Sequence, residues 1–495
     1  MLKSYSVQQI NSISKKKAIW CYGCGKRFHE IIAQYKGEPF LTRIEALIDG
    51  NRDLWGMQKE IAGRTIPVSS PETMQTADGK KILILITSDK DAEIYECNKA
   101  LLSDLQIDCS VYPRFYYTYA KAFLFIASLF PLRRQILYRA GEEPHENAEV
   151  IVKYLKSGYA GKPYRLIALS DSSSRGVKDN AENINKDTLR RQSSLKENIR
   201  YCMKYATSKF LLYENEALQK VRTGQKLIYL NHGMIPLKQV KDVLKQPDEL
   251  DYAVCPSTGC AEIYEEQYGI TKEKQVYMMP PRVERLFQNN LILHKMLDCG
   301  KRQIVIWLPT FRTLKNTDRK DSAVTSPLEI FGTDDVLEKL NDCLSRNQQL
   351  LVIKLHPRDK ESINISGKHK NIVLITEKDL EAAGASLQDI LGETAAMITD
   401  YSGIAFEYML LNRPIGYVIA DMDVYTRGFA VENPLAYMPG SKIKNEFDFM
   451  EFLNSLLLDE DIFRQERNEL AERLFGNMNP CAGAEMFIKF LDDRL

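Results

Sequence analysis

The stretch from Met397 to Tyr417 constrains the fold most, because it holds a strand, a turn, a helix and a second strand in succession. It reads MITDYSGIAFEYMLLNRPIGY. An apolar run ends in the polar turn Thr399–Gly403, and apolar residues then recur at helical spacing until Asn412 and Pro414. In an open parallel sheet such a turn lies at the carboxyl edge of its strand, where ligands bind.

The turn Thr399–Gly403 has two interpretations. Ser402 and Gly403 fall near the first turn of the helix, where free backbone N–H groups and the helix dipole favour a phosphate. Alternatively, the residues from Thr399 to Ser402 only cap the helix. Both interpretations stay open on this stretch alone.

The same alternation of short apolar runs and helical segments continues along the chain and predicts an α/β protein. The chain has 495 residues, of which 44% are hydrophobic and 27% charged, as is typical of a globular protein with several domains. Its net charge of +1 argues against a chain-wide nucleic-acid footprint, so no nucleic-acid partner is expected. We predict an N-terminal domain at 1–110, a connecting segment at 111–145, and two further αβ domains at 146–290 and 291–495.

The connecting segment contains an unusually apolar stretch, Phe115 to Leu132. This stretch carries Lys121 and is interrupted by Pro131, so it does not supply the ~18 apolar residues of a membrane span. With Arg133 and Arg134 directly after it, the stretch could lie in a membrane interface. The alternative is a helix buried between domains, and burial is the favoured interpretation.

The cysteines predict reduced thiols rather than disulfides or metal ligands. The ten cysteines are scattered, and only Cys21 and Cys24 form a CxxC pair, inside a glycine turn. No second pair follows at zinc spacing and no carboxylate cluster suggests a catalytic metal, so no metal site is predicted. The N-terminus lacks the succession of basic, apolar and small residues that marks a signal peptide.

The N-terminal domain begins like a dinucleotide-binding fingerprint. A predicted strand runs into Gly23 and Gly25, and Asp49 ends the next predicted strand. Phe28 takes the place of the third glycine, so the domain either binds a nucleotide or only packs and pairs with partners. An NAD-dependent oxidoreductase would rest on these residues alone. The domain resembles N-terminal domains of bacterial surface-polysaccharide enzymes at Ile48, Asp49, Asn51, Gly56, Pro67 and Val68.

Polar turns follow the predicted strands that end at Leu230, Leu308, Leu355 and Ile398. Each turn offers groups suited to an anionic ligand, since arginine donates two hydrogen bonds to phosphate and lysine and histidine add positive charge. No stretch resembles a Walker A loop. Two αβ domains with such edges predict a nucleotide-activated transferase. The basic side chains in or beside these turns are His232, Arg312, Lys354 and His356.

Several motifs of the chain, taken in order, are similar to those of the CDP-glycerol glycerophosphotransferase family, whose members build teichoic acids and capsular polymers. The resemblance covers roughly residues 145 to 490. The motifs are NHGMIPLK (231–238), PPR (280–282), LPTFR (308–312), IKLHP (353–357), ITDYSGIAFEYMLLNRP (398–414), VYTRGF (424–429) and PG (439–440).

The resemblance implies a GT-B fold, in which two Rossmann-like halves face a cleft. The acceptor-side half would be 146–290, and the donor half, which binds the CDP-polyol and includes the C-terminal helices, would be 291–495. A small Rossmann-like N-terminal domain is added here. It implies transfer of glycerol phosphate from CDP-glycerol, or ribitol phosphate from CDP-ribitol, to a hydroxyl of a lipid-linked polymer acceptor, with release of CMP. The implied reaction requires no cofactor beyond the CDP-polyol donor. The resemblance also implies a cytoplasmic protein attached peripherally to the inner face of the plasma membrane, and a homo-oligomer is compatible with it.

The resemblance also implies residue roles. His232 corresponds to the general base, and a histidine with its ordinary pKa near ~6.5 suits that task at neutral pH. His356 and Arg312 correspond to groups on the pyrophosphate that stabilise developing charge. Arg427 binds phosphate or closes the cleft. The other expected substrate-binding residues are Gly233, Lys238, Arg282, Thr310, Lys354, Thr399, Asp400, Ser402, Gly403 and Glu407.

The chain departs from the family pattern in four places, and these departures put the acceptor side in doubt. Asn231 replaces the usual tryptophan, and Met234 and Ile235 stand where one residue is usual, so the loop carrying His232 is one residue longer. Gly403 replaces the usual second serine. Glu407 replaces the usual aspartate.

Two other functions remain as alternatives. One is a nucleotide-sugar glycosyltransferase of surface polysaccharide synthesis, which shares the fold but predicts loss of the phosphate-transfer motifs. The other is a non-catalytic, nucleotide-sensing protein with a degenerate transferase half. The lengthened His232 loop keeps this second alternative open.

Overall fold

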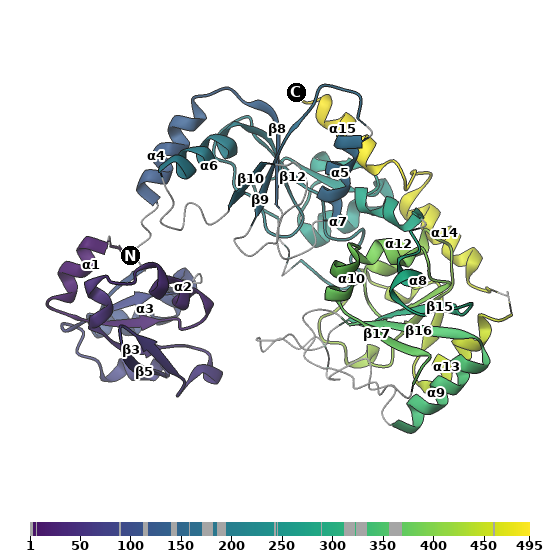
Figure 1. Ribbon diagram of the computed structural model, residues 1–495, viewed down its shortest axis with the longest axis horizontal. Helices are drawn as coiled ribbons and strands as arrows, with labels where there is room; N and C mark the ends of the chain where they lie inside the picture. The colour runs from purple at the N-terminus through teal and green to yellow at the C-terminus, as the bar shows by residue number, and fades with distance from the viewer. Residues whose placement is uncertain are drawn as a thin grey trace. The chain divides into compact units, whose positions relative to one another are not determined.

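The computed structural model describes residues 3–5, 7–88, 91–111, 117–139, 146–157, 159–170, 182–185, 195–241, 244, 246–288, 290–310, 322, 334–355, 369–458 and 461–495. These residues form two compact units (Figure 1). The first comprises Met1–Pro131 and Ile184–Ala206, and the second comprises Leu132–Asn183 and Thr207–Leu495.

The first unit is built on a seven-stranded sheet in the order β1-β7-β6-β2-β3-β5-β4, parallel except for the antiparallel β4–β5 hairpin. The strand order reverses between β2 and β6, as in Rossmann-like sheets. The strands are β1 (Lys3–Ser4), β2 (Ala18–Tyr22), β3 (Ile44–Ile48), β4 (Gln58–Ile61), β5 (Arg64–Ser69), β6 (Ile82–Ile86) and β7 (Asp108–Val111). The helices are α1 (Val7–Ser14), α2 (Lys26–Gln34), α3 (Asp91–Asp104), α4 (Tyr117–Ser128) and α6 (Leu195–Thr207).

Both faces of this sheet are covered. All five residues of β6 are buried, and they alternate between two hydrophobic clusters. A strand buried on both faces reads as a continuous apolar run, and the ILILI of β6 is such a run.

The second unit contains two sheets. The first has the strand order β10-β9-β8-β11-β12-β13-β14, and its strands from β9 to β14 in this order are parallel. Its strand order reverses between β8 and β11. The strands are β8 (Arg133–Arg139), β9 (Arg165–Ser170), β10 (Glu182–Asn185), β11 (Ser208–Tyr213), β12 (Lys226–Tyr229), β13 (Tyr252–Cys255) and β14 (Gln275–Tyr277). The helical segments are α5 (Glu146–Ser157), α7 (Ala261–Tyr268) and the 3-10 helix η6 (Pro281–Phe287).

Strand β8 was missed in the sequence, where its residues fell in the predicted connecting segment. It is nevertheless a central strand, paired with both β9 and β11. The run QILY is short and follows two arginines, so it carries a weak strand signal. Gln135 in this strand is fully buried, and its side-chain amide donates a 2.6 Å hydrogen bond to Ser208 Oγ. No local sequence pattern indicates this contact.

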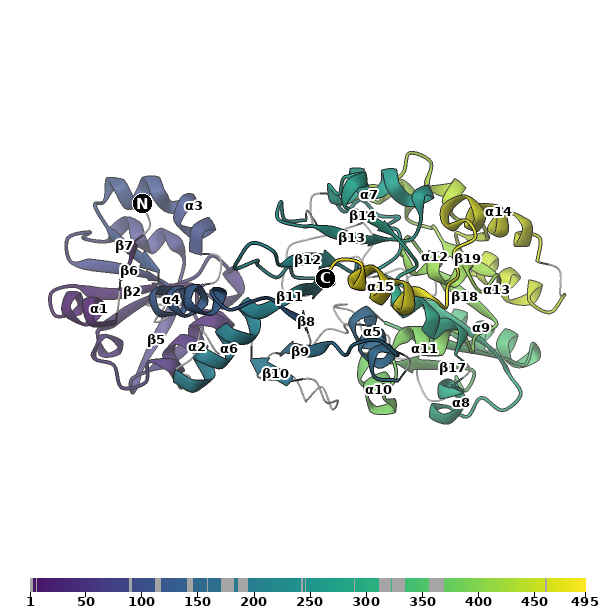
Figure 2. The same cartoon turned by 90° about the horizontal axis from the view of Figure 1, so that it is seen from above.

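The other sheet of the second unit is also parallel, in the order β17-β16-β15-β18-β19-β20. Helices α9 and α13 lie side by side on it (Figures 1 and 2). The strands are β15 (Gln303–Leu308), β16 (Gln349–Lys354), β17 (Ile372–Ile375), β18 (Ala396–Thr399), β19 (Ile415–Val418) and β20 (Ser441–Ile443). The helices are α8 (Ile292–Met296), α9 (Asp334–Arg346), α10 (Glu377–Ala383), α11 (Leu387–Leu391), α12 (Ile404–Met409), α13 (Glu446–Ser455), α14 (Arg464–Phe475) and α15 (Gly483–Asp492).

The C-terminal helices return to the first half of this unit. Helix α15 lies beside α5 (Figures 1 and 2), and its Phe487, Ile488 and Leu491 belong to the hydrophobic core of the β8–β14 sheet. Asp492, at the end of α15, accepts hydrogen bonds from Tyr159 and Tyr164 and pairs with Arg134. Two Rossmann-like halves joined in this way form the predicted GT-B architecture.

Apolar side chains are exposed in the last turn of α4 and directly after it. Phe125 is 68% exposed and Leu129 71% exposed, and Ile126 and Phe130 are exposed as well. These side chains are therefore not covered within the first unit, and burial between domains stays a prediction. Within the described residues, no helix is long and apolar enough to cross a membrane.

Candidate functional site

The turns after β15 and β18 lie next to each other at the centre of the β15–β20 sheet. The two strands are paired, and the strand order reverses between them. At such a reversal the connections leave toward opposite faces, which opens a crevice outside the carboxyl ends of the strands. Thr310 follows β15, and Thr399 ends β18.

The two turns are tied together by buried hydrogen bonds. Asp400 accepts a hydrogen bond of 3.0 Å from the backbone N–H of Thr310 and one of 2.7 Å from its hydroxyl, both through Oδ2. The hydroxyl of Thr399 donates a 2.9 Å hydrogen bond to the carbonyl of Leu308. Thr399 and Asp400 are fully buried. These side chains therefore fix the geometry of the two turns.

The helix-capping interpretation of Thr399–Ser402 is wrong. The residue at the N-cap of α12 is Gly403, and no side chain caps the helix there. Ser402 is half-buried, and its hydroxyl makes no hydrogen bond to another described residue. Its hydroxyl is the group of this turn that is available to a ligand.

An aromatic cluster that the sequence analysis did not single out supports the turn. Tyr401 is fully buried, and its hydroxyl donates a 2.9 Å hydrogen bond to Asp421. Its ring centroid lies 4.5 Å from that of Tyr425 and 5.2 Å from that of Phe429. The cluster anchors the segment that carries Arg427. The aromatic residues of TDYS and VYTRGF were the available signal.

The loop that carries His232 begins with a strained residue. Asn231 is buried and has a φ of +64°, a left-handed conformation that asparagine tolerates better than most residues. Its side chain accepts a 3.1 Å hydrogen bond from the Tyr229 hydroxyl and donates one of 2.5 Å to the Tyr264 hydroxyl. Tyr264 in turn donates to the carbonyl of Met234. The side chain of His232 is exposed on this anchored loop.

The two tyrosines stay protonated at neutral pH. Burial raises the pKa of Tyr229 and of Tyr264 well above the usual value for a phenol. Each hydroxyl therefore remains a hydrogen-bond donor to the loop. Asparagine in place of tryptophan is thus explained by hydrogen bonding and backbone conformation at this site.

A second polar network lies under the same loop. The side-chain amide of Asn147 donates hydrogen bonds to the carbonyl of Asn231 and to Glu214, at 3.0 and 3.1 Å. Its Oδ1 accepts a 3.0 Å hydrogen bond from the backbone N–H of Arg282. Asn147 and Glu214 are buried, and neither was identified in the sequence, where no motif marks them.

The His232 loop makes direct contact with the second half of the unit. Lys238 forms an antiparallel bridge with Phe429, and the backbone N–H of Gln239 donates a 3.1 Å hydrogen bond to Gly428. Arg427 donates a 3.0 Å hydrogen bond from Nε to the carbonyl of Gln239. The carboxyl-edge loops of both sheets therefore meet, and Arg427 helps to join them.

Two of the expected substrate-binding cations have carboxylate partners. Arg282 forms an ion pair with Glu407, and both side chains are buried. Gln388 donates a 3.1 Å hydrogen bond to the other oxygen of Glu407. Lys354 is buried and pairs with Glu377 at 2.8 Å. Arg282 and Glu407 therefore join η6 to α12, rather than presenting charge at the crevice.

Other expected site residues have simpler placements. Gly233 lies in open surroundings, where an added Cβ would meet nothing within 4 Å. Arg312 and His356, expected at the donor phosphates, lie outside the described residues. No group of His, Cys, Asp or Glu side chains within the described ranges could hold a metal ion.

In the first unit, the residues of the dinucleotide-binding fingerprint form contacts within the protein. Asp49 accepts hydrogen bonds from the backbone N–H groups of Cys24, at 2.5 Å, and Asn51, at 2.8 Å. Gly23 has a φ of +99°, and a Cβ there would lie 2.8 Å from Ser88 Cβ. Gly25 precedes α2 as its N-cap. Asp49 thus stabilises the glycine turn, and a nucleotide at Gly23, Gly25 and Asp49 stays a prediction without support from these contacts.

The CxxC pair lies in the same turn. All ten cysteines are free thiols, and both Cys21 and Cys24 are buried. Burial, with a smaller contribution from the Asp49 charge, raises the pKa of Cys24 to about 12. The reactive thiolate is therefore strongly disfavoured, which argues against redox chemistry here.

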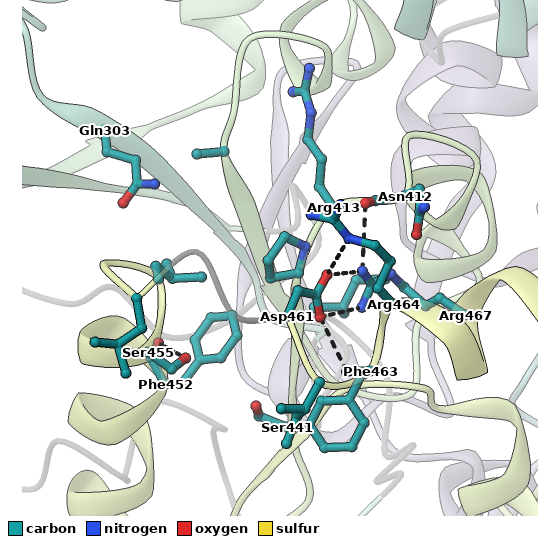
Figure 3. Close-up of a pocket in the computed structure, with 16 residues that line it drawn as sticks. Gln303, Asn412, Arg413, Ser441, Phe452, Ser455, Asp461, Phe463, Arg464 and Arg467 are labelled. Carbon is teal, nitrogen blue, oxygen red and sulfur yellow. Dashed lines mark hydrogen bonds and ion pairs between the residues drawn. The ribbon is translucent and has the colours of Figure 1, made fainter.

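A cavity of about 420 Å³ lies at the opposite, amino edge of the β15–β20 sheet (Figure 3). Gln303, Ile415 and Ser441, which begin three of its strands, contribute to the lining. Asp461 pairs with both Arg464 and Arg467 in the cavity wall. Because these charges already have partners and the cavity is at the wrong edge, it is not the predicted transferase site.

Comparison with known proteins agrees with the motifs. A family model described as CDP-Glycerol:Poly(glycerophosphate) glycerophosphotransferase matches residues 123–479. The teichoic acid glycerol-phosphate primase of Bacillus subtilis (strain 168) is 26% identical over 204 residues, which are 41% of this chain and 48% of the relative. The teichoic acid ribitol-phosphate polymerase TarL of Staphylococcus aureus is 28% identical over 194 residues, 37% of this chain and 32% of the relative. The chain thus spans less than half the length of these curated relatives.

One solved structure supports the fold. The wall teichoic acid polymerase TagF aligns over 82% of this chain and 98% of that chain, with a TM-score of 0.56 and 16% identity. At this identity the likeness concerns the fold alone, and it agrees with two Rossmann-like halves in the second unit.

Proposed function

The chain belongs to the CDP-glycerol:poly(glycerophosphate) glycerophosphotransferase family, and we propose on this basis that it transfers a polyol phosphate from a CDP-polyol to a hydroxyl. The donor is CDP-glycerol or CDP-ribitol. The acceptor is a growing cell-surface polymer or its lipid-linked primer, and CMP is released.

One observation carries this proposal to the site: the loop with the exposed His232 meets the turn Thr399–Gly403 across the two halves. An added Cβ at Gly403 would lie 2.6 Å from the carbonyl oxygen of Ile235, so the two loops are in contact. This contact supports the proposal that His232, as the general base, and the turn Thr399–Gly403, as the phosphate site, act on the same substrate.

In the proposed reaction, the acceptor oxygen attacks the phosphorus that carries the polyol. A new O–P bond forms, the bond from that phosphorus to the bridging oxygen breaks, and CMP leaves with the electron pair. The proton of the acceptor hydroxyl passes to His232. Thr310 and Ser402 belong to the turns that hold the donor phosphates, and Arg312 and His356 stabilise the charge that develops on them.

The decisive experiment is a donor screen that measures CMP release with a hydroxyl-terminated acceptor. CDP-glycerol, CDP-ribitol and nucleotide sugars are compared. His232→Ala should lose about 100-fold or more of the rate, since a general base contributes about this much. His294→Ala is the matched control, because His294 is a partly exposed histidine that belongs to α8 rather than to either loop, and it pairs with Glu393.

The outcomes separate the parts of the proposal. No CMP release from any CDP-polyol would overturn it. Release of a nucleoside diphosphate from a nucleotide sugar would favour the glycosyltransferase alternative. A wild-type rate for His232→Ala would remove only the assignment of the base.

Peripheral attachment to the inner membrane face belongs to the same proposal. The exposed Phe125 of α4 and the exposed Leu129 directly after the helix would supply apolar side chains for an interface. Arg134 is not available for headgroups, since it pairs with Asp492 and lies over the Tyr164 ring at 4.1 Å. Of the two arginines that the interfacial interpretation places at the headgroups, Arg133 is the exposed one.

Vesicle sedimentation tests this attachment. The double variant Phe125→Ser and Leu129→Ser should bind vesicles of phosphatidylglycerol and phosphatidylcholine less than wild type does. Leu457→Ser, at another exposed leucine, is the control. Equal binding by wild type and the double variant would exclude α4 as the attachment site.

A further inference from the structure

Gly403 is required by space rather than by backbone conformation. Its φ of −62° is open to any residue. An ideal Cβ at this position would lie 2.6 Å from the carbonyl oxygen of Ile235, closer than real Cβ atoms approach. The carbonyl therefore occupies the space that a side chain at position 403 would need.

The His232 loop cannot easily move away from this contact. On one side of Ile235, the carbonyl of Met234 accepts a 2.8 Å hydrogen bond from the buried Tyr264 hydroxyl. On the other side, the carbonyl of Leu237 accepts a 2.8 Å hydrogen bond from the backbone N–H of Ala430. Ile235 itself is 2% exposed.

The opposite partner is held equally firmly. Gly403 follows a turn in which Asp400 binds both donor groups of Thr310, and Tyr401 is buried in the aromatic cluster. A side chain at position 403 would thus have to displace either the turn Thr399–Gly403 or the loop that carries His232.

Two departures from the family pattern meet at this one contact: the additional residue in the His232 loop and the missing side chain at position 403. We propose that they are a single compensating change, in which Gly403 is a positioning residue that sets how closely the His232 loop approaches the donor phosphates. The kinetic part of this inference rests on the proposed function; the contact itself does not.

The experiment uses the full chain with Gly403→Ser, the deletion of Ile235, and the two changes together. Gly403→Ser alone should lower kcat for CMP release about 10- to 100-fold, the range expected for a small displacement of a catalytic group. CDP-glycerol binding, measured by calorimetry, should change less than threefold. The double variant should regain at least tenfold in kcat over Gly403→Ser alone.

Two further variants keep the result interpretable. Gly403→Ala adds only one carbon and serves if the serine variant folds poorly. Gly259→Ala controls for a general clash, because its Cβ would lie 2.3 Å from the carbonyl of Arg473, away from the His232 loop. It should lower the Tm without the selective loss of kcat.

The inference is overturned if Gly403→Ser keeps the wild-type kcat, or if the double variant is no faster than Gly403→Ser alone. Absence of turnover in the wild type would instead refute the proposed function. In that case the contact is tested by Tm: the double variant should be more stable than the sum of the two single effects predicts. Additive Tm changes would contradict the proposed coupling between position 403 and the His232 loop.

Discussion

Asp400 accepts hydrogen bonds from both the backbone N–H and the hydroxyl of Thr310, two groups 90 residues away in the sequence. The pair joins the turns after β15 and β18 where the strand order of the sheet reverses. A carboxylate that fits two donors of one residue fixes both distance and orientation. The two turns are therefore held rigidly together before any ligand binds.

Asp400→Ala should weaken the connection between these two turns. It leaves the N–H and hydroxyl of Thr310 buried without their acceptor, at a cost of about 1–3 kcal/mol in the free energy of unfolding for an unsatisfied group. CDP-glycerol binding should weaken in parallel. Urea denaturation and calorimetry measure the two effects. Thr310→Val is the matched variant. The two changes together should be less than additive, because both remove the hydrogen bond from the Thr310 hydroxyl to Asp400.

Glu407→Ala should be the most destabilising of the variants considered. It leaves Arg282 buried without its carboxylate, and breaking a buried ion pair costs about 3–5 kcal/mol. Arg282→Met in the same chain should restore part of the loss, since it removes the uncompensated charge. Guanidinium denaturation gives the free energies of unfolding. Equal stability of Glu407→Ala and wild type would contradict the importance of this pair.

Ser402→Ala should affect donor binding rather than folding. The hydroxyl is half-buried and makes no hydrogen bond within the described part of the chain, so its removal leaves no buried partner unsatisfied. A hydrogen bond to a charged phosphate is worth about 1.5–3 kcal/mol, so the Kd for CDP-glycerol should rise about tenfold or more. The Tm should stay close to that of wild type. An unchanged Kd would exclude Ser402 from the phosphate site.

Asp492 should make stability depend on pH in the acid range. Burial opposes its ionisation, but hydrogen bonds from Tyr164 and Tyr159 and the charge of Arg134 outweigh burial and lower the pKa of the carboxyl. A lowered native pKa gives stability that is complete above the unfolded value and disappears as the pH falls through the native value. Asp492→Asn should therefore be less stable than wild type at pH 7.

The difference in free energy of unfolding between wild type and Asp492→Asn should shrink as the pH falls from about 5 toward about 2. Asp493→Asn is the control, because its carboxyl has no ion-pair partner in the described ranges. A difference that stayed constant through the acid range would contradict the assigned shift.

The strands and turns of the fold were predictable where their signals are local. The apolar runs at 18–22, 44–48, 303–308 and 372–375 each predict a strand from local pattern alone, and β2, β3, β15 and β17 have these bounds. The polar turns after β12 and β18 were recognised as well, because an apolar run that ends in small and polar residues needs no information from elsewhere. Strand β8 was missed, since its burial comes from neighbours far along the chain.

The sequence by itself thus determined the α/β pattern, the positions of the polar turns and, through several motifs in order, the family. Only the tertiary structure decided which groups meet. Arg282 pairs with Glu407, and Gly403 accommodates the carbonyl of Ile235, because the two halves pack in one particular way. Burial makes such contacts strong, and they join residues with no shared local pattern, so their partners follow from packing alone.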